Sequence, residues 1–274
     1  MIDFSNVLEK VKDNYPGLNQ RRLQQEFQLF QENFIFSGRY QTEGFLFDEF
    51  QEYLIKGIPL EYINNEAYFF ESRFFVNENV LIPRSESEIL IEKLLQKLSK
   101  KKNLEICEIG VGSLALGISL CLKLRTSVQF LGTDISEKAL EVAQENLVRF
   151  TQRLKHVAFD LRKTDRLKGV DQKFDCIFSN PPYVKKSQRS KVHPQVDKNE
   201  PELALYLEDE SYSQWNRELI AACAKSLKKG GFFILEGHED NLGELELIAQ
   251  NYFSQVTSFN DYSERKRFIL LEFN

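Results

Sequence analysis

The chain has 274 residues, of which 42% are hydrophobic, and it carries a formal net charge of -5 at pH 7. This length is sufficient for one large domain, or for a large domain and a small one, around a sizeable core. The acidic balance disfavours nucleic acid as a partner and favours a protein or a small molecule as substrate. The N-terminus has no basic segment followed by an apolar one, and no apolar run is long enough to span a membrane. We therefore expect a cytoplasmic protein without a membrane partner.

Residues 1–64 are predicted to form a small helical domain. Apolar residues recur there at helical spacing, and Pro16-Gly17 and Gly57 interrupt the stripes. The three stripes consist of Val7, Leu8 and Val11, then of Leu23, Phe27, Phe30, Phe34 and Ile35, and last of Phe45, Phe47, Phe50, Tyr53 and Leu54. Core packing explains these aromatic residues, and a surface for a partner is a second use that remains open.

Residues 65–82 are predicted to be a hairpin that links this domain to the next. The pattern changes here to short apolar runs that Asn77 and Asn79 punctuate. The runs are Tyr68-Phe69-Phe70, Phe74-Phe75-Val76 and Val80-Leu81-Ile82. A helix should follow, with Leu90 and Leu94 on its apolar face.

The remaining residues, 83–274, are predicted to form an α/β domain. Strand-like segments alternate with helical patterns such as Glu137–Phe150 and Trp215–Leu227, which indicates a parallel sheet covered on both faces. The expected strands are Glu105–Ile109, Val128–Thr133, Lys155–Phe159, Phe174–Ser179, Phe232–Glu236 and Phe268–Phe273. Ligands of such sheets bind at the carboxyl ends of the strands, near the point where the strand order reverses.

Cysteine and histidine spacing predicts neither disulfides nor a metal site. The cysteines form no CxxC pair and lie in apolar strand-like or helix-like runs, so we expect them to be reduced core residues. They are Cys107, Cys121, Cys176 and Cys223. The histidines are scattered and form no cluster with metal-ligand spacing.

A glycine pair follows the first predicted strand of the sheet, in the segment Glu108-Ile109-Gly110-Val111-Gly112-Ser113-Leu114-Ala115. Gly110 and Gly112 would form a tight turn that lets backbone approach a ligand closely, and Ala115 fits the small third position of the G-x-G-x-x-G/A pattern. Glycine pairs after strands are common, so this signal alone is weak.

Asp134 ends the second strand, 134 − 110 = 24 positions after Gly110. An acidic residue about 20 positions after the glycines is where a ribose-binding carboxylate is expected. The other explanation, a helix N-cap, fits Ser136 better. We therefore favour the ribose role in combination with the glycines.

Two further carboxylates are expected at the same rim of the sheet. Glu108 ends an apolar strand beside the glycine loop, where burial without a partner is expensive, and a cationic ligand group would supply that partner. Asp160, followed by Leu161, is expected to close the third strand and to line the cofactor site. A nicotinamide enzyme would show the same features.

The tetrapeptide Asn180-Pro181-Pro182-Tyr183 after the fourth strand indicates the chemistry. Two prolines hold the backbone and remove two N–H donors, so nearby carbonyls stay free. The loop then presents an amide, a free carbonyl and an aromatic ring together, which suits a planar NH2 group. A plain proline-rich turn would require neither the asparagine nor the tyrosine.

This tetrapeptide resembles the motif of S-adenosylmethionine methyltransferases that act on planar nitrogens, in adenine or in glutamine. Further segments resemble the HemK/PrmC-like release factor glutamine methyltransferases. These are Gly57–Ile63, Phe74–Val76, Val80–Glu88, Glu200-Pro201 with Ala204-Leu205, and Asp261-Tyr262 with Arg265 and Arg267. The resemblance runs from about Gly57 to the C-terminus.

The resemblance implies a Rossmann-like methyltransferase sheet with a small N-terminal helical domain. It also implies that S-adenosylmethionine is the cofactor and that the glutamine of a Gly-Gly-Gln motif in peptide chain release factors is the substrate. Asn180 would contact cofactor and substrate, and Pro181, Pro182 and Tyr183 would complete the catalytic site. The other implied cofactor contacts are Glu108, Gly110, Val111, Gly112, Ser113, Leu114, Asp134 and Leu161.

Three positions depart from the family pattern. Leu114 stands where glycine is usual, and it would crowd the cofactor or displace the loop. Ser85 replaces a usual proline, and the segment Leu207–Ser211 lacks the expected glycines.

Other functions therefore remain open: an adenine-directed DNA or RNA methyltransferase, a ribosomal-protein glutamine methyltransferase, or a family member that binds a partner without catalysis. The basic run Lys185, Lys186, Arg189 and Lys191 fits phosphate binding, although a solvated loop face is the commoner explanation.

Overall fold

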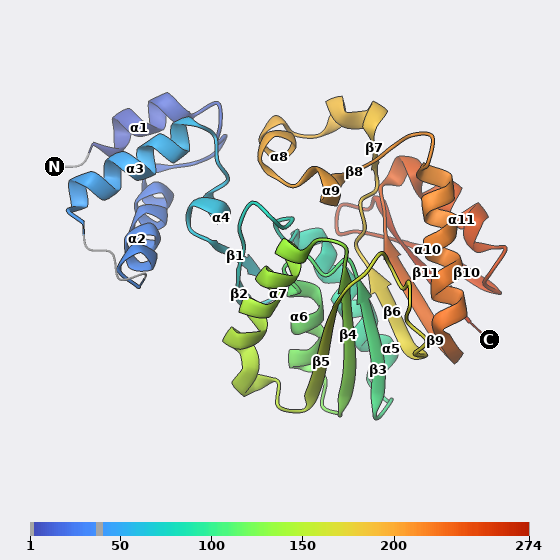
Figure 1. Ribbon diagram of the computed structural model, residues 1–274. Helices are drawn as coiled ribbons and strands as arrows, with labels where there is room; N and C mark the ends of the chain where they lie inside the picture. Colours follow the sequence, from blue (N-terminus) through green and yellow to red (C-terminus); the bar gives the residue numbers. More distant parts are fainter. Residues whose placement is uncertain (1–2, 37–40, 274) are drawn as a thin grey trace.

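The computed structural model describes residues 3–36 and 41–273. The expected domain ranges also include residues 1, 2, 37–40 and 274, which lie outside the described residues, as does the side chain of Ile35. Figure 1 shows a group of N-terminal helices that stands apart from a sheet with helices around it.

The N-terminal group has an apolar core of its own. Its helices are α1 (Phe4–Val11), α2 (Gln20–Phe36), α3 (Glu43–Ile55) and α4 (Leu60–Ile63). The predicted apolar stripes meet in this core, where Leu23, Phe50 and Leu54 are fully buried. Thr42 begins α3, because its hydroxyl accepts a hydrogen bond from the backbone N–H of Phe45. Phe27, Phe30, Phe47 and Phe50 therefore pack against one another, while Phe45 of the third stripe is exposed.

A two-stranded hairpin follows, as the sequence predicts. Strands β1 (Glu66–Phe69) and β2 (Ser72–Phe75) pair antiparallel. Phe70 and Glu71 both have positive φ at the turn, which is the backbone conformation of a tight two-residue hairpin loop. The third apolar run, Val80–Ile82, does not continue the hairpin as a strand; Val80 and Ile82 are buried in a small core beside it.

The central sheet has seven strands in the order β10-β11-β9-β6-β3-β4-β5. They are β3 (Leu104–Ile109), β4 (Val128–Asp134), β5 (Val157–Lys163), β6 (Phe174–Ser179), β9 (Leu227–Glu236), β10 (Gln255–Asn260) and β11 (Lys266–Glu272). The expected parallel arrangement holds from β9 to β5, while β11 and β10 are antiparallel. The connection between β10 and β11 is only a few residues long, and so short a connection joins antiparallel strands.

Helices cover both faces of the sheet, as expected from the alternation of strands and helices. One face packs on α5 (Glu88–Leu98), α6 (Ala115–Lys123) and α7 (Glu137–Phe150), and the other on α10 (Tyr212–Ser226) and α11 (Glu239–Ala249). Successive residues of β3 and β6 point to opposite faces and are buried on both, which is typical of central parallel strands. All four cysteines are buried and free in these layers.

A group of short elements lies between β6 and α10. It contains β7 (Val184–Lys185), the 3-10 helix η3 (Lys186–Lys191), α8 (Pro194–Asn199), α9 (Glu202–Leu205) and β8 (Tyr206–Leu207), and two more 3-10 turns, η1 (Ser85–Ser87) and η2 (Thr151–Arg153), occur elsewhere. The side chains of Gln195 and Asn199 in α8 donate hydrogen bonds to the carbonyl of Gly57, each at 3.1 Å. Helix α8 therefore bonds to the segment between α3 and α4, and Figure 1 shows α8 on the side of the short elements that faces the N-terminal helices. In the described ranges, 3–36 and 41–273, no helix has the length and apolar character needed to cross a membrane.

Candidate active site

A cavity lies at the carboxyl ends of β3, β4 and β6, as predicted for a sheet of this type. The chain runs outward from β3 to β4 and β5 and then returns to the other side of β3 with β6, so the strand order reverses there. Seven of the predicted site residues from these strand ends line this first cavity together with Pro181 and Pro182. The seven are Glu108, Gly110, Val111, Gly112, Ser113, Asp134 and Asn180.

The glycine loop has the backbone shape that only glycine adopts easily. Gly110 has φ +73 and Gly112 has φ +50. A Cβ built at either residue would have no heavy atom of the described chain within 4 Å, so both positions face open space. The fully buried Asn146 holds the loop from behind, because its Nδ2 donates to the carbonyls of Ser113 and Phe75, each at 2.9 Å. Nothing in the local sequence identified Asn146.

Asp134 joins the glycine loop to the next helix. One carboxylate oxygen accepts from the backbone N–H of Gly112 at 3.0 Å, and the other accepts from Ser136 at 2.9 Å. Each oxygen retains a lone pair for a ligand hydroxyl. Ser136 is the N-cap of α7, as predicted, because its hydroxyl accepts from the N–H of Ala139. Asp134 is therefore free of the capping role and lines the cavity.

Glu108 is almost fully buried at the end of β3, with 1% of its surface exposed. Burial raises the pKa of its carboxyl group well above the ordinary value, against the opposing effect of a hydrogen bond from the Gly117 backbone. Its Oε2 has no hydrogen-bond partner within the described part of the chain. Glu108 lines the cavity, but its Oε2 lies against Gly117 of α6, so its contact with a cationic ligand group stays a prediction.

The prediction that Asp160 closes the third strand is wrong. Strand β5 does not end at Phe159 but continues to Lys163, so Asp160 lies in its middle. Its side chain is half exposed and forms an ion pair with Arg162, and it does not belong to the residues that line the cavity. Leu161 points to the other face of β5, where it packs against Gly132, and it does not line the cavity either.

The true end of β5 brings different residues to the cavity. Thr164, Asp165 and Arg166 follow the strand and line the cavity wall. The backbone N–H of Thr164 donates to the carbonyl of Asp134 at 2.9 Å, which holds this segment against the end of β4. The alternation of apolar Val157, Phe159 and Leu161 with polar residues was the signal for the longer strand.

Leu114 does not crowd the cavity. Its backbone is left-handed, with φ +62, which explains why glycine is usual at this position. Its side chain is fully buried in the core under α6 and does not line the cavity, although its neighbours Ser113 and Ala115 do. The leucine therefore fills the core behind the loop.

We predict that Leu114→Gly destabilises the protein without strengthening cofactor binding. Deleting a buried leucine costs about 2–5 kcal/mol, and relieving a left-handed backbone returns about 1–2 kcal/mol. A net loss of roughly 1–3 kcal/mol in the free energy of unfolding should appear in urea titrations. Leu114→Ala, which retains the strain, should be less stable still. A rise in cofactor affinity for Leu114→Gly by calorimetry would contradict this account.

Asn180 lies where the first cavity meets a second one, and it lines both. Its Nδ2 donates to the hydroxyl of Ser87 at 3.3 Å. Its Oδ1 is buried and meets no hydrogen-bond donor among the residues that the structure describes. Asn180, at the junction of the two cavities, thus has an amide oxygen whose capacity to accept a hydrogen bond is unused within the described chain.

Tyr183 lines the second cavity only. Asn241 at the start of α11 donates to its backbone carbonyl at 3.1 Å, which anchors the loop. Burial raises the pKa of its phenol, so the ring is neutral at any physiological pH. Tyr183 therefore offers a ring face and a neutral hydroxyl on the side away from the glycine loop.

A buried ion pair forms part of the wall between the two cavities. Arg84 lines both cavities and pairs with Glu200, whose side chain is fully buried. Glu200 also accepts from the backbone N–H of Ile82 at 3.1 Å. Burial raises the pKa of Glu200, and Arg84 opposes that shift. The sequence offered Arg84 and Glu200 only as parts of two separate motifs, 116 positions apart.

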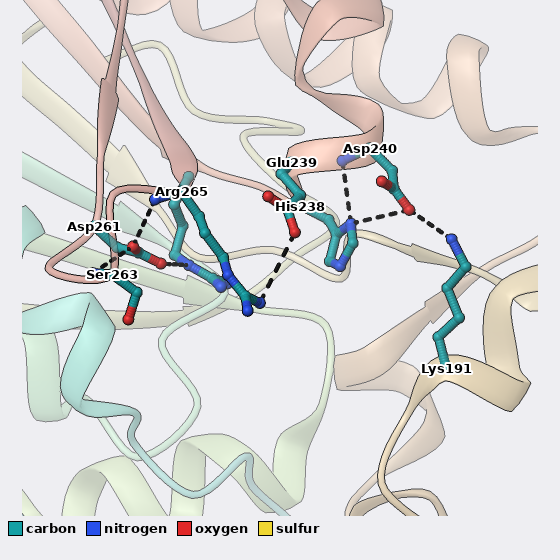
Figure 2. A network of polar contacts seen from close by, with 8 residues as sticks. Lys191, His238, Glu239, Asp240, Asp261, Ser263 and Arg265 are labelled. Carbon is teal, nitrogen blue, oxygen red and sulfur yellow. Dashed lines mark hydrogen bonds and ion pairs between the residues drawn. The ribbon is translucent and has the colours of Figure 1, made fainter.

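The basic run after the tetrapeptide is neutralised within the protein. Each of its four side chains forms at least one ion pair, and Figure 2 shows the contact of Lys191 with Asp240 at 2.6 Å. The pairs are Lys185 with Glu244, Lys186 with Glu202 and Glu208, Arg189 with Asp197 and Glu202, and Lys191 with Asp240. This run is therefore not a free cationic surface for phosphates.

Asp261 organises the turn between β10 and β11. One oxygen accepts from the backbone N–H groups of Ser263 and Arg265, and the other accepts from Nε of Arg267 at 2.9 Å. Figure 2 shows this turn beside the start of α11, where Arg265 reaches Glu239. The turn thus holds Arg267 toward the buried end of β9.

No group of three or more potential metal ligands occurs in residues 3–36 and 41–273.

Comparisons with known proteins agree on one enzyme class. A family model of the methyltransferase small domain matches residues 85–198. A release factor glutamine methyltransferase from Flavobacterium psychrophilum is 36% identical over 220 residues, which cover 78% of this chain and 75% of the relative. The enzyme of the same name from Chlorobaculum tepidum is 30% identical, with 78% and 74% covered.

Solved structures support the fold. The hMettl16 catalytic domain in complex with MAT2A 3′UTR hairpin 6 matches with a TM-score of 0.57 at 14% identity, over 73% of this chain and 75% of that chain. A methyltransferase from Pyrococcus furiosus matches with a TM-score of 0.52 at 18% identity, over 73% and 87%. At such low identity these two likenesses concern the fold alone.

Proposed function

The chain belongs to the release factor glutamine methyltransferase family, and from this we propose that it methylates the glutamine of the Gly-Gly-Gln motif in peptide chain release factors. The methyl group would come from S-adenosylmethionine and go to the side-chain amide nitrogen. The observation that carries this proposal is the place of Asn180, which lines both cavities with a buried oxygen that lacks a donor in the described chain.

The first cavity fits S-adenosylmethionine, which supplies a methyl group on a sulfonium when bound. Gly110 and Gly112 leave open space where side chains would otherwise stand. Asp134 has lone pairs for the ribose hydroxyls, and Glu108 lines the cavity as the candidate partner of the amino group. These four residues are our candidates for holding the cofactor.

In our proposal, the tetrapeptide holds the acceptor amide of the glutamine in position for methyl transfer. An amide nitrogen is a poor nucleophile because its lone pair is delocalised, as the roughly 18–20 kcal/mol rotation barrier of amides shows. In our proposal the Oδ1 of Asn180 and the carbonyl of Pro181 accept the two N–H bonds of the glutamine, and the ring of Tyr183 packs on the amide plane. Such positioning is worth up to about 7–11 kcal/mol. Water takes the proton that the nitrogen loses.

The second cavity is our candidate for the acceptor channel. Asn180, Tyr183, Gln188 and His238 line it, and no residue of the glycine loop does. We further propose that the helices of residues 1–64 form a substrate-recognition domain, that residues 65–82 link it, and that residues 83–274 form the methyltransferase domain. Gln195 and Asn199 of α8, which bond to Gly57, would then transmit the position of the first domain to the acceptor channel.

An adenine-directed methyltransferase would use the same tetrapeptide, because adenine also has a planar NH2 group. The ion pairs of the basic run argue against nucleic acid, since the four cations already have carboxylate partners. A ribosomal-protein glutamine remains the second candidate substrate.

A transfer assay with labelled S-adenosylmethionine tests the proposal. Purified release factor, ribosomal proteins and DNA are offered in parallel, and the modified residue is mapped by mass spectrometry. Label on the glutamine of the release factor is the expected result. Label on DNA or on ribosomal protein would replace the proposed substrate, and a folded protein that labels none of them would overturn the proposal.

A further inference from the structure

Three side chains from distant parts of the chain form a hydrogen-bonded relay behind the tetrapeptide. The Nδ2 of Asn180 donates to the hydroxyl of Ser87 at 3.3 Å, and that hydroxyl donates to Glu236 at 2.6 Å. Ser87 and Glu236 are 2% and 1% exposed. Ser87 lines the first cavity, whereas Glu236, which ends β9, lines neither cavity. The relay therefore runs from the cavity junction into the protein, and its last member is out of reach of any ligand there.

The relay determines which end of the Asn180 amide points to Ser87 and which end is left for another partner. A hydroxyl has one proton, and an ionised carboxylate only accepts hydrogen bonds. When Glu236 is ionised, Ser87 must donate to it, so Ser87 can only accept from Asn180. The NH2 end of the amide must then point to Ser87, and the oxygen must point away from it. This is the arrangement in the structure, where Oδ1 is buried without a donor among the described residues.

We propose that Ser87 and Glu236 are positioning residues that orient the Asn180 amide, so that the site accepts a glutamine amide and rejects a glutamate carboxylate. This inference rests on the proposed function. With its oxygen toward the acceptor, Asn180 receives an N–H bond, which a glutamine side chain offers and an ionised glutamate does not. If the Asn180 amide were rotated so that its NH2 group met the acceptor, the site would favour the carboxylate of a glutamate instead. The selectivity thus depends on a residue that touches neither substrate nor cofactor.

Protonation of Glu236 should remove the constraint that it places, through Ser87, on the orientation of the Asn180 amide. The groups that face Glu236 are Arg84, Glu86 and Ser87 before α5, Arg267 on β11 and Tyr183 after β6. Burial raises the pKa of Glu236 to about 7, while Ser87 and Arg267 oppose the shift. Protonated Glu236 can donate to Ser87, which frees the serine proton for the Asn180 oxygen. Turnover should therefore fall as the pH drops through about 7.

The central experiment uses Glu236→Gln, because glutamine retains the shape of the side chain but can donate as well as accept. Binding is measured by calorimetry with S-adenosylhomocysteine present, for full-length release factor and for a form in which the motif glutamine is replaced by glutamate. The wild-type protein should prefer the glutamine form by at least about tenfold, since the wrong form leaves a buried polar group unsatisfied. Glu236→Gln should lower that preference to below about threefold and flatten the decline of turnover below pH 7.

Three further variants serve as controls. Glu272→Gln makes the same change on β11, at a half-buried carboxylate that pairs with Lys97 outside both cavities, and it should retain the wild-type preference. Ser87→Ala should lose the preference while Ser87→Thr, which keeps the hydroxyl, should restore it. If Glu236→Gln does not fold, this serine pair decides the outcome.

The outcomes separate the two proposals. A wild-type protein that labels the release factor, with variants that retain both its preference and its pH profile, would overturn the relay alone. A wild-type protein that neither labels nor binds the release factor would overturn the proposed function and the relay with it.

Discussion

Asn180→Ala is expected to lower turnover on release factor by at least about a hundredfold, the loss typical of removing one preorganised polar group at a reacting centre. The buried oxygen of Asn180 is the feature that orients the acceptor nitrogen in our proposal. Cofactor binding should survive in part, because Glu108, Gly112 and Asp134 are untouched. Single-turnover labelling measures the first quantity, and calorimetric titration with S-adenosylhomocysteine measures the second.

Asn251→Ala is the matched control for this experiment. Asn251 lies after α11, where its amide donates to the carbonyls of Leu247 and Ile248, and it lines neither cavity. The same loss of an amide there should leave turnover unchanged. Wild-type turnover in Asn180→Ala would refute the role given to the tetrapeptide. Complete loss of cofactor binding would instead place Asn180 mainly in the cofactor site.

Arg84→Met is expected to lower the free energy of unfolding by about 3–5 kcal/mol, because it leaves a buried charge without its partner. The side chain of Glu200 is fully buried, and Arg84 is the cation that offsets the cost of this burial. Methionine retains most of the apolar stem of arginine, so lost packing contributes little. Urea titrations at a fixed pH measure the loss.

The loss of stability in Arg84→Met should grow as the pH rises. Without Arg84, the folded-state pKa of Glu200 lies further above its unfolded value than it does now. The folded state then holds a proton that the unfolded state releases, so stability falls from the unfolded pKa upward to the folded one. Arg162→Met is the control, because the pair of Arg162 with Asp160 is exposed and should contribute at most about 1 kcal/mol. A pH-independent loss in Arg84→Met would contradict this account.

Local patterns predicted the central elements of the fold well. Strand β6 and helix α7 have the predicted bounds, Phe174–Ser179 and Glu137–Phe150, because one is buried on both faces and the other begins at a serine cap. Strand β5 was predicted too short, since it is an edge strand whose exposed face carries Asp160 and Arg162. Charged residues on the open face of an edge strand interrupt the apolar signal without ending the strand. This one boundary moved Asp160 out of the predicted site.

The sequence by itself determined the α/β class, the ends of β4 and β6 that line the first cavity, and the tetrapeptide that indicates the chemistry. These features depend on residues that are close neighbours in the chain, and short-range geometry decides how they lie. Only the tertiary structure decided which distant side chains meet. The hydroxyl of Ser87, which lies before α5, contacts both Glu236, 149 positions away at the end of β9, and Asn180 after β6, because β9 and β6 are neighbours in the sheet and their ends lie side by side. Arg84 meets Glu200 in the same way, through the packing of the short elements on the strand ends. No local pattern encodes such contacts, since they arise from the packing of elements that lie far apart in the chain.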